Sequence, residues 1–148
     1  MIAANALLVD TGFLVALFRR RDKLRAAARR FLTASRAPLA TVAPVIVETC
    51  FFLSAAEKQD LLEWAKRGAL AVHDVPTAAY PKLSWLIGKY ADRDPDFTDM
   101  ALVWLAQENN CRRVLTVDTG DFTAYRAKAG KSFDLPAWMD CGAVAELD

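Results

Sequence analysis

The sequence predicts an α/β fold in which a short parallel sheet lies between two layers of helices. Short apolar runs without alternation recur along the chain, and longer segments with helical spacing of apolar residues separate them. Such runs are typical of strands buried on both faces, and their alternation with helices favours parallel pairing through right-handed crossovers. No repeat, low-complexity tract or Gly/Ser linker divides the 148 residues, so we expect a single domain over residues 1–148.

Each expected strand is a short apolar run that ends at a turn residue or a charged residue. The run at residues 6–9 stops at Asp10-Thr11-Gly12, and the run at residues 113–117 ends directly before Asp118. The expected strands cover residues 6–9, 38–41, 69–72 and 113–117, with a weak last strand near residues 133–135. In such a sheet the carboxyl ends of the strands form one edge, and ligands bind just outside that edge.

Helices are expected in six segments whose apolar residues recur with helical periodicity. They cover residues 13–18, 22–35, 43–56, 58–67, 78–90 and 96–108. Pro44 stands near the first turn of its helix, where a missing N–H costs little. Gly68 is expected to end the helix that precedes the third strand.

The four tryptophans are expected to divide between the core and the surface. Trp64, Trp85 and Trp104 lie at helical spacing with other apolar residues, which predicts packing in the core. Trp138 lies in a proline-containing tail, where we expect it to be exposed or to contact a partner. His73 follows the third predicted strand and is expected to form a local hydrogen bond.

The composition excludes several kinds of chemistry. One histidine among 148 residues excludes a His–His acid/base ribonuclease site and a multi-histidine zinc site. The three cysteines form an odd set, with Cys50 and Cys111 in apolar or helical segments, so we expect free thiols in a reducing compartment. The apolar N-terminal run lacks a basic flank and is broken by Asp10, so it fits neither a signal peptide nor a membrane span. We therefore expect a cytoplasmic protein without a membrane partner.

The net charge of +1 hides an uneven distribution of charged residues. Residues 1–36 hold eight basic and two acidic side chains, whereas residues 37–148 hold eleven basic and sixteen acidic ones. The basic excess predicts a phosphate-binding rim beside an acidic site, with an ordinary solvated helix face as the alternative. The candidate phosphate-binding residues are Arg19, Arg20, Arg21, Lys23 and Arg25.

Acidic residues from four separate elements are expected to meet at the carboxyl edge of the sheet. Asp10 and Asp118 directly follow strands, Glu48 lies in an otherwise apolar helix, and Asp99 lies in the first turn of the last long helix. An unpaired carboxylate in apolar surroundings is costly, so Glu48 needs a cation partner or a proton. Converging carboxylates repel one another unless a hard cation is present, and oxygen-only ligands fit Mg²⁺ or Mn²⁺ rather than zinc.

Each of these acids also has a purely structural interpretation. Asp10 and Asp96 could be N-caps of the helices that follow them. Asp99 could complement a helix dipole, and Asp118 could belong to a turn. Glu48 could pair with one of the arginines. The convergence of the acids at one edge is what favours the metal-site interpretation.

Four segments of the chain resemble, in order and in spacing, the motifs of PIN-domain ribonucleases, particularly the VapC-type toxins of prokaryotic toxin–antitoxin pairs. The similarity extends from Leu7 to about Arg126. The segments begin with Leu8-Val9-Asp10-Thr11-Gly12, Val47-Glu48-Thr49, Asp96-Phe97-Thr98-Asp99 and Val114-Leu115-Thr116-Val117-Asp118. This resemblance implies a three-layer α/β/α PIN-like fold with a short central parallel sheet.

The resemblance also implies an activity, that of an Mg²⁺-dependent endoribonuclease toxin, with Mn²⁺ as the alternative ion. A metal-activated water would hydrolyse RNA phosphodiester bonds. The residues that would hold the metal and carry the catalysis are Asp10, Glu48, Asp99 and Asp118. The accessory polar residues would be Thr11, Thr116 and Asp121, with Asp96 as the less favoured counterpart of Asp99.

The expected partners are an RNA substrate, a cognate antitoxin protein and a second copy of the chain in a homodimer. The apolar faces of the helices at residues 22–35 and 45–53 exceed what a small sheet can cover, so an antitoxin segment or a second subunit would bind them. The alternatives are a housekeeping PIN-domain RNA-processing nuclease and a catalytically silent binding module. A haloacid-dehalogenase-like phosphatase would need a second aspartate where Gly12 stands.

Overall fold

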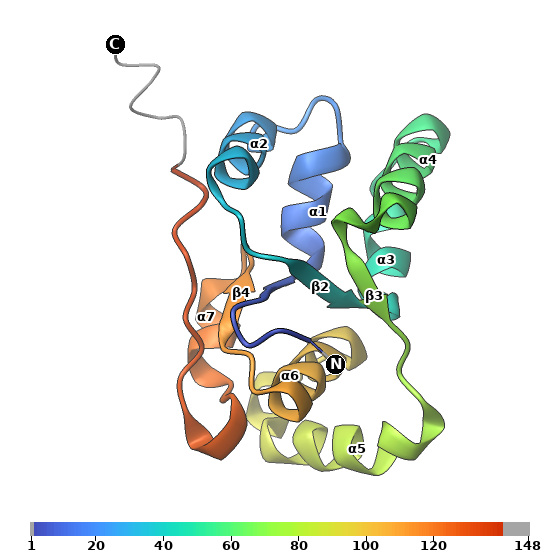
Figure 1. Cartoon of the computed structure of the whole chain (residues 1–148). Helices are drawn as coiled ribbons and strands as arrows, with labels where there is room; N and C mark the ends of the chain where they lie inside the picture. Colours follow the sequence, from blue (N-terminus) through green and yellow to red (C-terminus); the bar gives the residue numbers. More distant parts are fainter. Residues whose placement is uncertain (1, 141–148) are drawn as a thin grey trace.

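A sheet of four parallel strands lies at the centre of the computed structural model, which describes residues 2–140 (Figure 1). The strands are β1 Leu7–Val9, β2 Leu39–Val42, β3 Ala71–His73 and β4 Arg113–Leu115, in the spatial order β3-β2-β1-β4. The chain proceeds from β1 toward β3 on one side, and β4 joins β1 on the other. The strand order therefore reverses between β1 and β4, which is where ligands bind in open parallel sheets.

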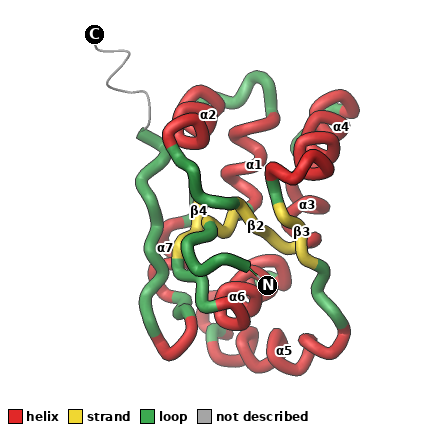
Figure 2. Tube along the Cα trace, in the orientation of Figure 1, coloured by secondary structure: helices red, strands yellow, loops and turns green. Residues whose placement is uncertain are grey.

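Helices cover both faces of this sheet, as Figures 1 and 2 show. On one side lie α1 Thr11–Phe18, α2 Arg25–Ala34 and α4 Ala55–Trp64, and on the other lie α5 Tyr80–Lys89 and α6 Phe97–Asn109. Helix α3, Ala43–Cys50, contacts both α1 and α6, and the short α7, Thr119–Ala124, follows β4. The predicted three-layer α/β/α arrangement is confirmed.

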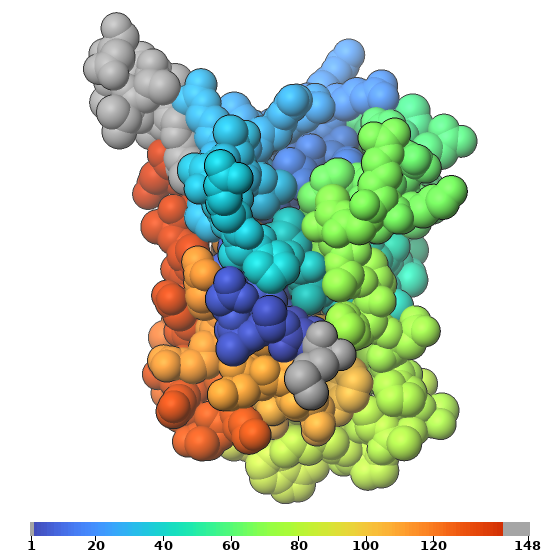
Figure 3. Space-filling model, viewed as in Figure 1, coloured from blue at the N-terminus to red at the C-terminus, as the bar shows by residue number. Residues whose placement is uncertain are grey.

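The core is built around β1 and α6. All three β1 residues are fully buried, as predicted for a strand covered on both faces, and α6 places seven of its residues in the interior. The edge strand β3 differs, because Ala71 and Val72 are exposed. Figure 3 shows the segment before β1 lying against the region around β4 and α6, where Ile2 N donates to Asn109 Oδ1 (3.3 Å). The segment before β1 therefore packs at the amino edge of the sheet, opposite the carboxyl edge.

The first four predicted strands and the six predicted helices are confirmed, but several of their boundaries move. The helix expected at residues 43–56 ends at Cys50, and the next one begins at Ala55 because Ser54 forms a capping box with Glu57. The strand expected at residues 133–135 is reduced to one bridge between Arg113 and Asp134. Helix α7 was not expected. Short helical turns at Ala65–Ala69, Thr77–Ala79, Ala91–Arg93 and Lys128–Gly130 join the main elements.

Two of the four tryptophan predictions are wrong. Trp138 is fully buried, with its ring edge-to-face against Phe13 at 4.7 Å, because the tail crosses the molecule beside α1. Trp85 is 55% exposed, since α5 turns Leu83 and Leu86 inward and leaves Trp85 beneath two lysine side chains. Trp64 and Trp104 are partly buried against the core, as predicted.

Among the described residues, the most exposed large apolar side chain lies in the turn that follows α3. In α2, Ala27 and Ala28 are buried and Phe31 packs against Phe13, while Leu24 and Leu32 are only partly buried. Next to α3, in contrast, Phe51 is 77% exposed and Phe52 is 55% exposed. Large apolar side chains remain uncovered there.

Three other expectations concern single residues and the membrane. Cys50 and Cys111 are free thiols, whereas Cys141 lies outside the described residues. The buried Nε2 of His73 has no hydrogen-bond partner within residues 2–140, so a local bond through that atom is not found. None of the described helices is long and apolar enough to cross a membrane.

The capping box at Ser54 predicts a measurable loss of stability. Ser54 Oγ accepts from Glu57 N (3.2 Å), and Glu57 also accepts from the backbone of Ser54 and Arg20 (2.8 Å each). Ser54→Ala should cost about 1 kcal/mol, which lowers Tm by about 2–4 °C. Thermal unfolding measures this, with Ser84→Ala on the exposed face of α5 as the matched control. An equal Tm for both variants would show that the cap is energetically silent.

Candidate metal centre

Three aspartates meet at the carboxyl edge because each one caps the N-terminus of a helix there. Asp10, Asp96 and Asp118 accept hydrogen bonds from backbone N–H groups of α1, α6 and α7 at 2.8, 2.7 and 3.2 Å. Asp10 directly follows β1, and Asp118 follows β4 after two intervening residues. For Asp10, the predicted role as helix cap and the predicted place at the sheet edge apply to the same side chain. Asp118, which the sequence assigned to a turn as the alternative, is a helix cap as well.

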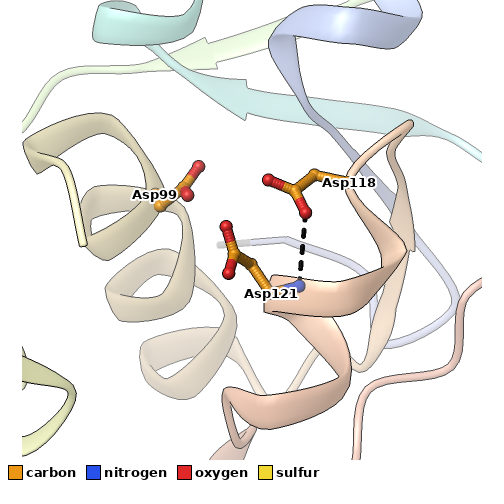
Figure 4. Close-up of side chains that lie close together, drawn as sticks. All are labelled: Asp99, Asp118 and Asp121. Carbon is orange, nitrogen blue, oxygen red and sulfur yellow. Dashed lines mark hydrogen bonds between the residues drawn. The ribbon is translucent and has the colours of Figure 1, made fainter. Parts of the chain in front are cut away.

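Three carboxylates lie close together, one from α6, one from α7 and one from the residue directly before α7. Asp99, Asp118 and Asp121 each offer an oxygen, and these atoms lie within 4.8 Å of one another. In Figure 4 the Asp99 side chain extends from its helix toward the Asp118–Asp121 pair. Asp121 was expected only as an accessory residue, yet it belongs to this group. Asp96 lies at the helix cap, and its partner Asp99 faces the other acids.

Asp10 is held more deeply, at 7% exposure. Its Oδ1 accepts from Thr11 N, and its Oδ2 accepts from Thr116 Oγ1 at 2.9 Å. Thr116 Oγ1 in turn accepts from Asp118 N at 2.8 Å. One threonine hydroxyl therefore links the two strand-end aspartates. A Cβ on Gly12 would overlap the Val117 side chain, so the glycine lets α1 begin this close to β4.

Glu48 is half-buried and faces two hydroxyl groups. Thr11 Oγ1 donates to Glu48 Oε1 at 3.3 Å, and Thr98 Oγ1 donates to Oε2 in a short hydrogen bond. Within residues 2–140 no ion pair involves Glu48, so a cation partner is not what accommodates it. Thr98 was not predicted from the sequence, although its place directly before Asp99 in the first turn of α6 was a usable signal.

Burial and mutual repulsion favour the protonated form of these carboxyl groups. Burial, followed by the charges of Asp10, Asp96, Asp118 and Asp121, raises the pKa of Asp99 to about 8. Burial also raises the pKa of Asp10 to about 6, despite hydrogen bonds that lower it. The pKa of Asp118 is raised by burial and by its neighbour Asp121.

Arg93 is the basic residue that faces this cluster. Its Nη1 forms an ion pair with Asp121 Oδ1 at 2.9 Å, and its charge lowers the pKa of Asp118. One arginine does not offset several converging carboxylates, as the pKa of Asp99 shows. The close group consists of aspartates alone, and such an all-oxygen donor set fits a hard divalent cation such as Mg²⁺ or Mn²⁺.

Trp138 contacts the residues that carry the site, which the sequence did not predict. Its Nε1 donates to the carbonyl oxygen of Thr116 at 3.0 Å, while its ring packs against Phe13 at the start of α1. It therefore fixes the strand end that carries the Thr116 hydroxyl. No local pattern in the tail signals this contact, because it joins residues 22 positions apart.

The basic residues expected beside the acids lie elsewhere. Arg19, Arg20 and Arg21 follow the C-terminus of α1, whereas Asp10 caps its N-terminus. An eight-residue helix is about 12 Å long, so these arginines lie at the far end of α1 from Asp10. Arg20 pairs with Asp60 (3.2 Å). Lys23 and Arg25 instead line a groove with basic residues of α2.

The fold and this arrangement of acids define a family. The family model described as the PIN domain matches residues 7–128, and the chain therefore belongs to the PIN domain family. This confirms the resemblance drawn from the motifs.

One solved structure gives a closer comparison of the fold. The chain is similar to VapC20 of Mycobacterium tuberculosis, described as a toxin that cleaves the sarcin–ricin loop, with a TM-score of 0.70 and 16% identity. The alignment covers 78% of this chain and 93% of that one, and at this identity it shows a shared fold. Comparison with curated protein sequences gives no match.

Asp99→Asn should stabilise the protein when no metal is present. The Asp99 carboxyl has a folded-state pKa of about 8 against 3.8 in the unfolded chain, so the stability it contributes is present below pH 4 and is lost as the pH rises toward 8. In EDTA, the Tm of the variant relative to wild type should therefore rise between pH 5 and pH 9, by a few °C. Glu108→Gln, near the other end of α6, is the control. A pH-independent difference would contradict the repulsion.

Trp138→Phe should weaken the metal centre while preserving most of the packing. The variant keeps an aromatic ring against Phe13 but leaves the Thr116 carbonyl unpaired, at a cost of about 1–3 kcal/mol. We expect a lower Tm and a smaller rise in Tm on addition of Mg²⁺. Trp85→Phe, at an exposed position of α5, should change neither. An unchanged response to Mg²⁺ would limit Trp138 to a packing role.

Proposed function

We propose that this PIN-domain protein is an Mg²⁺-dependent endoribonuclease that acts as the toxin of a toxin–antitoxin pair. The observation that carries the proposal is the convergence of carboxylates from β1, α3, α6 and the β4–α7 junction at one edge of the sheet. Family membership and the fold shared with an RNA-cleaving toxin support the same reaction class. A protein that only binds a partner has no need for clustered carboxylates whose mutual repulsion disfavours their ionised form, as the raised pKa of Asp99 shows.

The metal would be held by Asp10, Glu48, Asp99 and Asp118. Asp121 adds a further carboxylate, since it lies in the closest group. When bound, the ion would lower the pKa of a water molecule and stabilise the charge that develops on the phosphodiester. Mn²⁺ fits the same oxygen ligands.

The other polar residues of the site orient these carboxylates. Thr116 holds Asp10 and the backbone of Asp118, while Thr11 and Thr98 hold the two oxygens of Glu48. Because the pKa of Asp99 is about 8 without a cation, metal binding displaces a proton at neutral pH. Metal affinity, and with it activity, should therefore rise with pH up to about 8.

Two features of the surface support the proposed RNA substrate and protein partners. An RNA long enough to pass from the acids along α1 could reach the basic cluster of Arg19, Arg20, Arg21, Lys23 and Arg25, which would make binding sensitive to salt. The uncovered apolar side chains Phe51 and Phe52 offer a surface for an antitoxin segment or for a second copy in a homodimer.

Cleavage of a mixed RNA pool tests this function. With Mg²⁺ the wild-type protein should produce fragments, and EDTA should abolish them. Asp10→Asn and Asp99→Asn should each lower the rate by about 100-fold or more, because each removes a charged ligand of the ion. Glu108→Gln is the charge-matched control and should cleave at the wild-type rate. Cleavage that persists in EDTA, or in both asparagine variants, would rule out this site.

A further inference from the structure

An open groove of about 590 Å³ lies beside the acidic cluster, bounded by α3, α6 and the segment that leads from β3 to α5. Its apolar lining includes Val47, Val75, Tyr80 and Phe97. Val47 is 57% exposed, Tyr80 48% and Phe97 42%, so three large apolar side chains are left uncovered around one hollow. A groove of this size and lining is typical of a ligand site.

This groove is continuous with the site already described. Glu48 and Thr98, which are joined by a hydrogen bond, both line it. On α3, Val47 directly precedes Glu48, and on α6, Phe97 directly precedes Thr98. A substrate held at the carboxylates is therefore adjacent to the groove.

The lining fits a flat neutral group rather than a phosphate. The rings of Tyr80 and Phe97 meet edge to face with centroids 6.0 Å apart, and both keep exposed surface. No lysine or arginine is among the groove's lining residues in the described part of the chain, so a phosphate would find no cation there. Asp74 and Glu48 instead present carboxylates, which accept hydrogen bonds from ring N–H and amino groups.

A protein partner has a different surface available to it. Phe51 and Phe52 are more exposed than either ring of the groove, and neither of them lines it. The groove, in contrast, shares its wall with a carboxylate of the metal centre. Its position thus favours a part of the substrate as its occupant.

We propose that this groove binds one unpaired base of the RNA, next to the phosphodiester that is cleaved. Tyr80 and Phe97 would contact the base, as aromatic side chains do with unstacked bases of single-stranded RNA. Asp74 would accept a hydrogen bond from a ring N–H or an amino group of the base. This inference rests on the proposed ribonuclease function and extends it to the choice of cleavage position.

Binding and cleavage of a short single-stranded RNA test the base site. Wild type, Tyr80→Leu and Phe97→Leu are titrated in EDTA at low salt with a fluorescein-labelled oligonucleotide, and cleavage is followed after Mg²⁺ is added. Each leucine variant should bind about tenfold more weakly and show a raised KM at similar kcat, because the ring is lost and the bulk retained. Trp85→Leu removes an exposed ring outside the groove and should behave as wild type.

A second substrate locates the base. An RNA series with one abasic nucleotide at successive positions near the cut should contain one member that wild type binds about tenfold more weakly. The leucine variants should lose no further affinity for that member. Additive losses would mean that the rings contact something other than that base.

The outcomes separate this inference from the function on which it rests. If both leucine variants bind and cleave as wild type does, the base site is wrong and the ribonuclease function stands. If wild type shows no metal-dependent cleavage, the proposed function fails, and equal affinity for intact and abasic RNA in EDTA overturns the base site too. If the leucine variants instead convert a dimer to a monomer in sedimentation, with RNA binding unchanged, the groove is an interface between copies of this chain.

Discussion

The buried Asp10 carboxylate joins the two halves of the carboxyl edge. It accepts one hydrogen bond from the first turn of α1 and another from Thr116 just after β4, so it links β1 and β4, between which the strand order reverses. These bonds offset part of the cost of burying a carboxylate, although its pKa remains raised to about 6. Thr116 extends this network. Its hydroxyl oxygen accepts a hydrogen bond from Asp118 N, and its carbonyl oxygen accepts one from Trp138 Nε1.

At the carboxyl edge of the sheet, the acids that form the candidate metal centre also lower the local stability of the fold. Asp10, Asp96 and Asp118 each cap a helix, and the positive ends of those helices partly stabilise their negative charge. The caps therefore offset part of the cost of bringing these acids together. They do not remove the repulsion, because Asp99 still has a pKa of about 8. Repulsion among these acids lowers the stability of the folded chain, and a bound cation would offset that cost. Reduced stability at a functional site is a common compromise between stability and activity.

The sequence could predict the acids because the rules that place them are topological. A short apolar run followed by an aspartate puts that aspartate at the carboxyl edge of a parallel sheet, whatever else the chain does, so Asp10 and Asp118 could be located without coordinates. Thr98, Arg93 and Trp138 act through contacts between distant segments, and no periodicity encodes such contacts. The position of the basic cluster could not be predicted for a related reason. Its distance from the acids depends on the length and direction of α1, which charge counting ignores.

One contact between helices organises both the metal centre and the groove beside it. The hydrogen bond from Thr98 to Glu48 fixes α6 against α3 at the carboxyl edge. Successive residues of an α-helix point about 100° apart, so Val47 and Phe97 leave their helices in directions different from Glu48 and Thr98. The same pairing thus places polar and apolar side chains next to one another along the groove. Residues of the groove can therefore change what lies next to the acids without altering the acids themselves, which separates the choice of substrate from the chemistry performed on it.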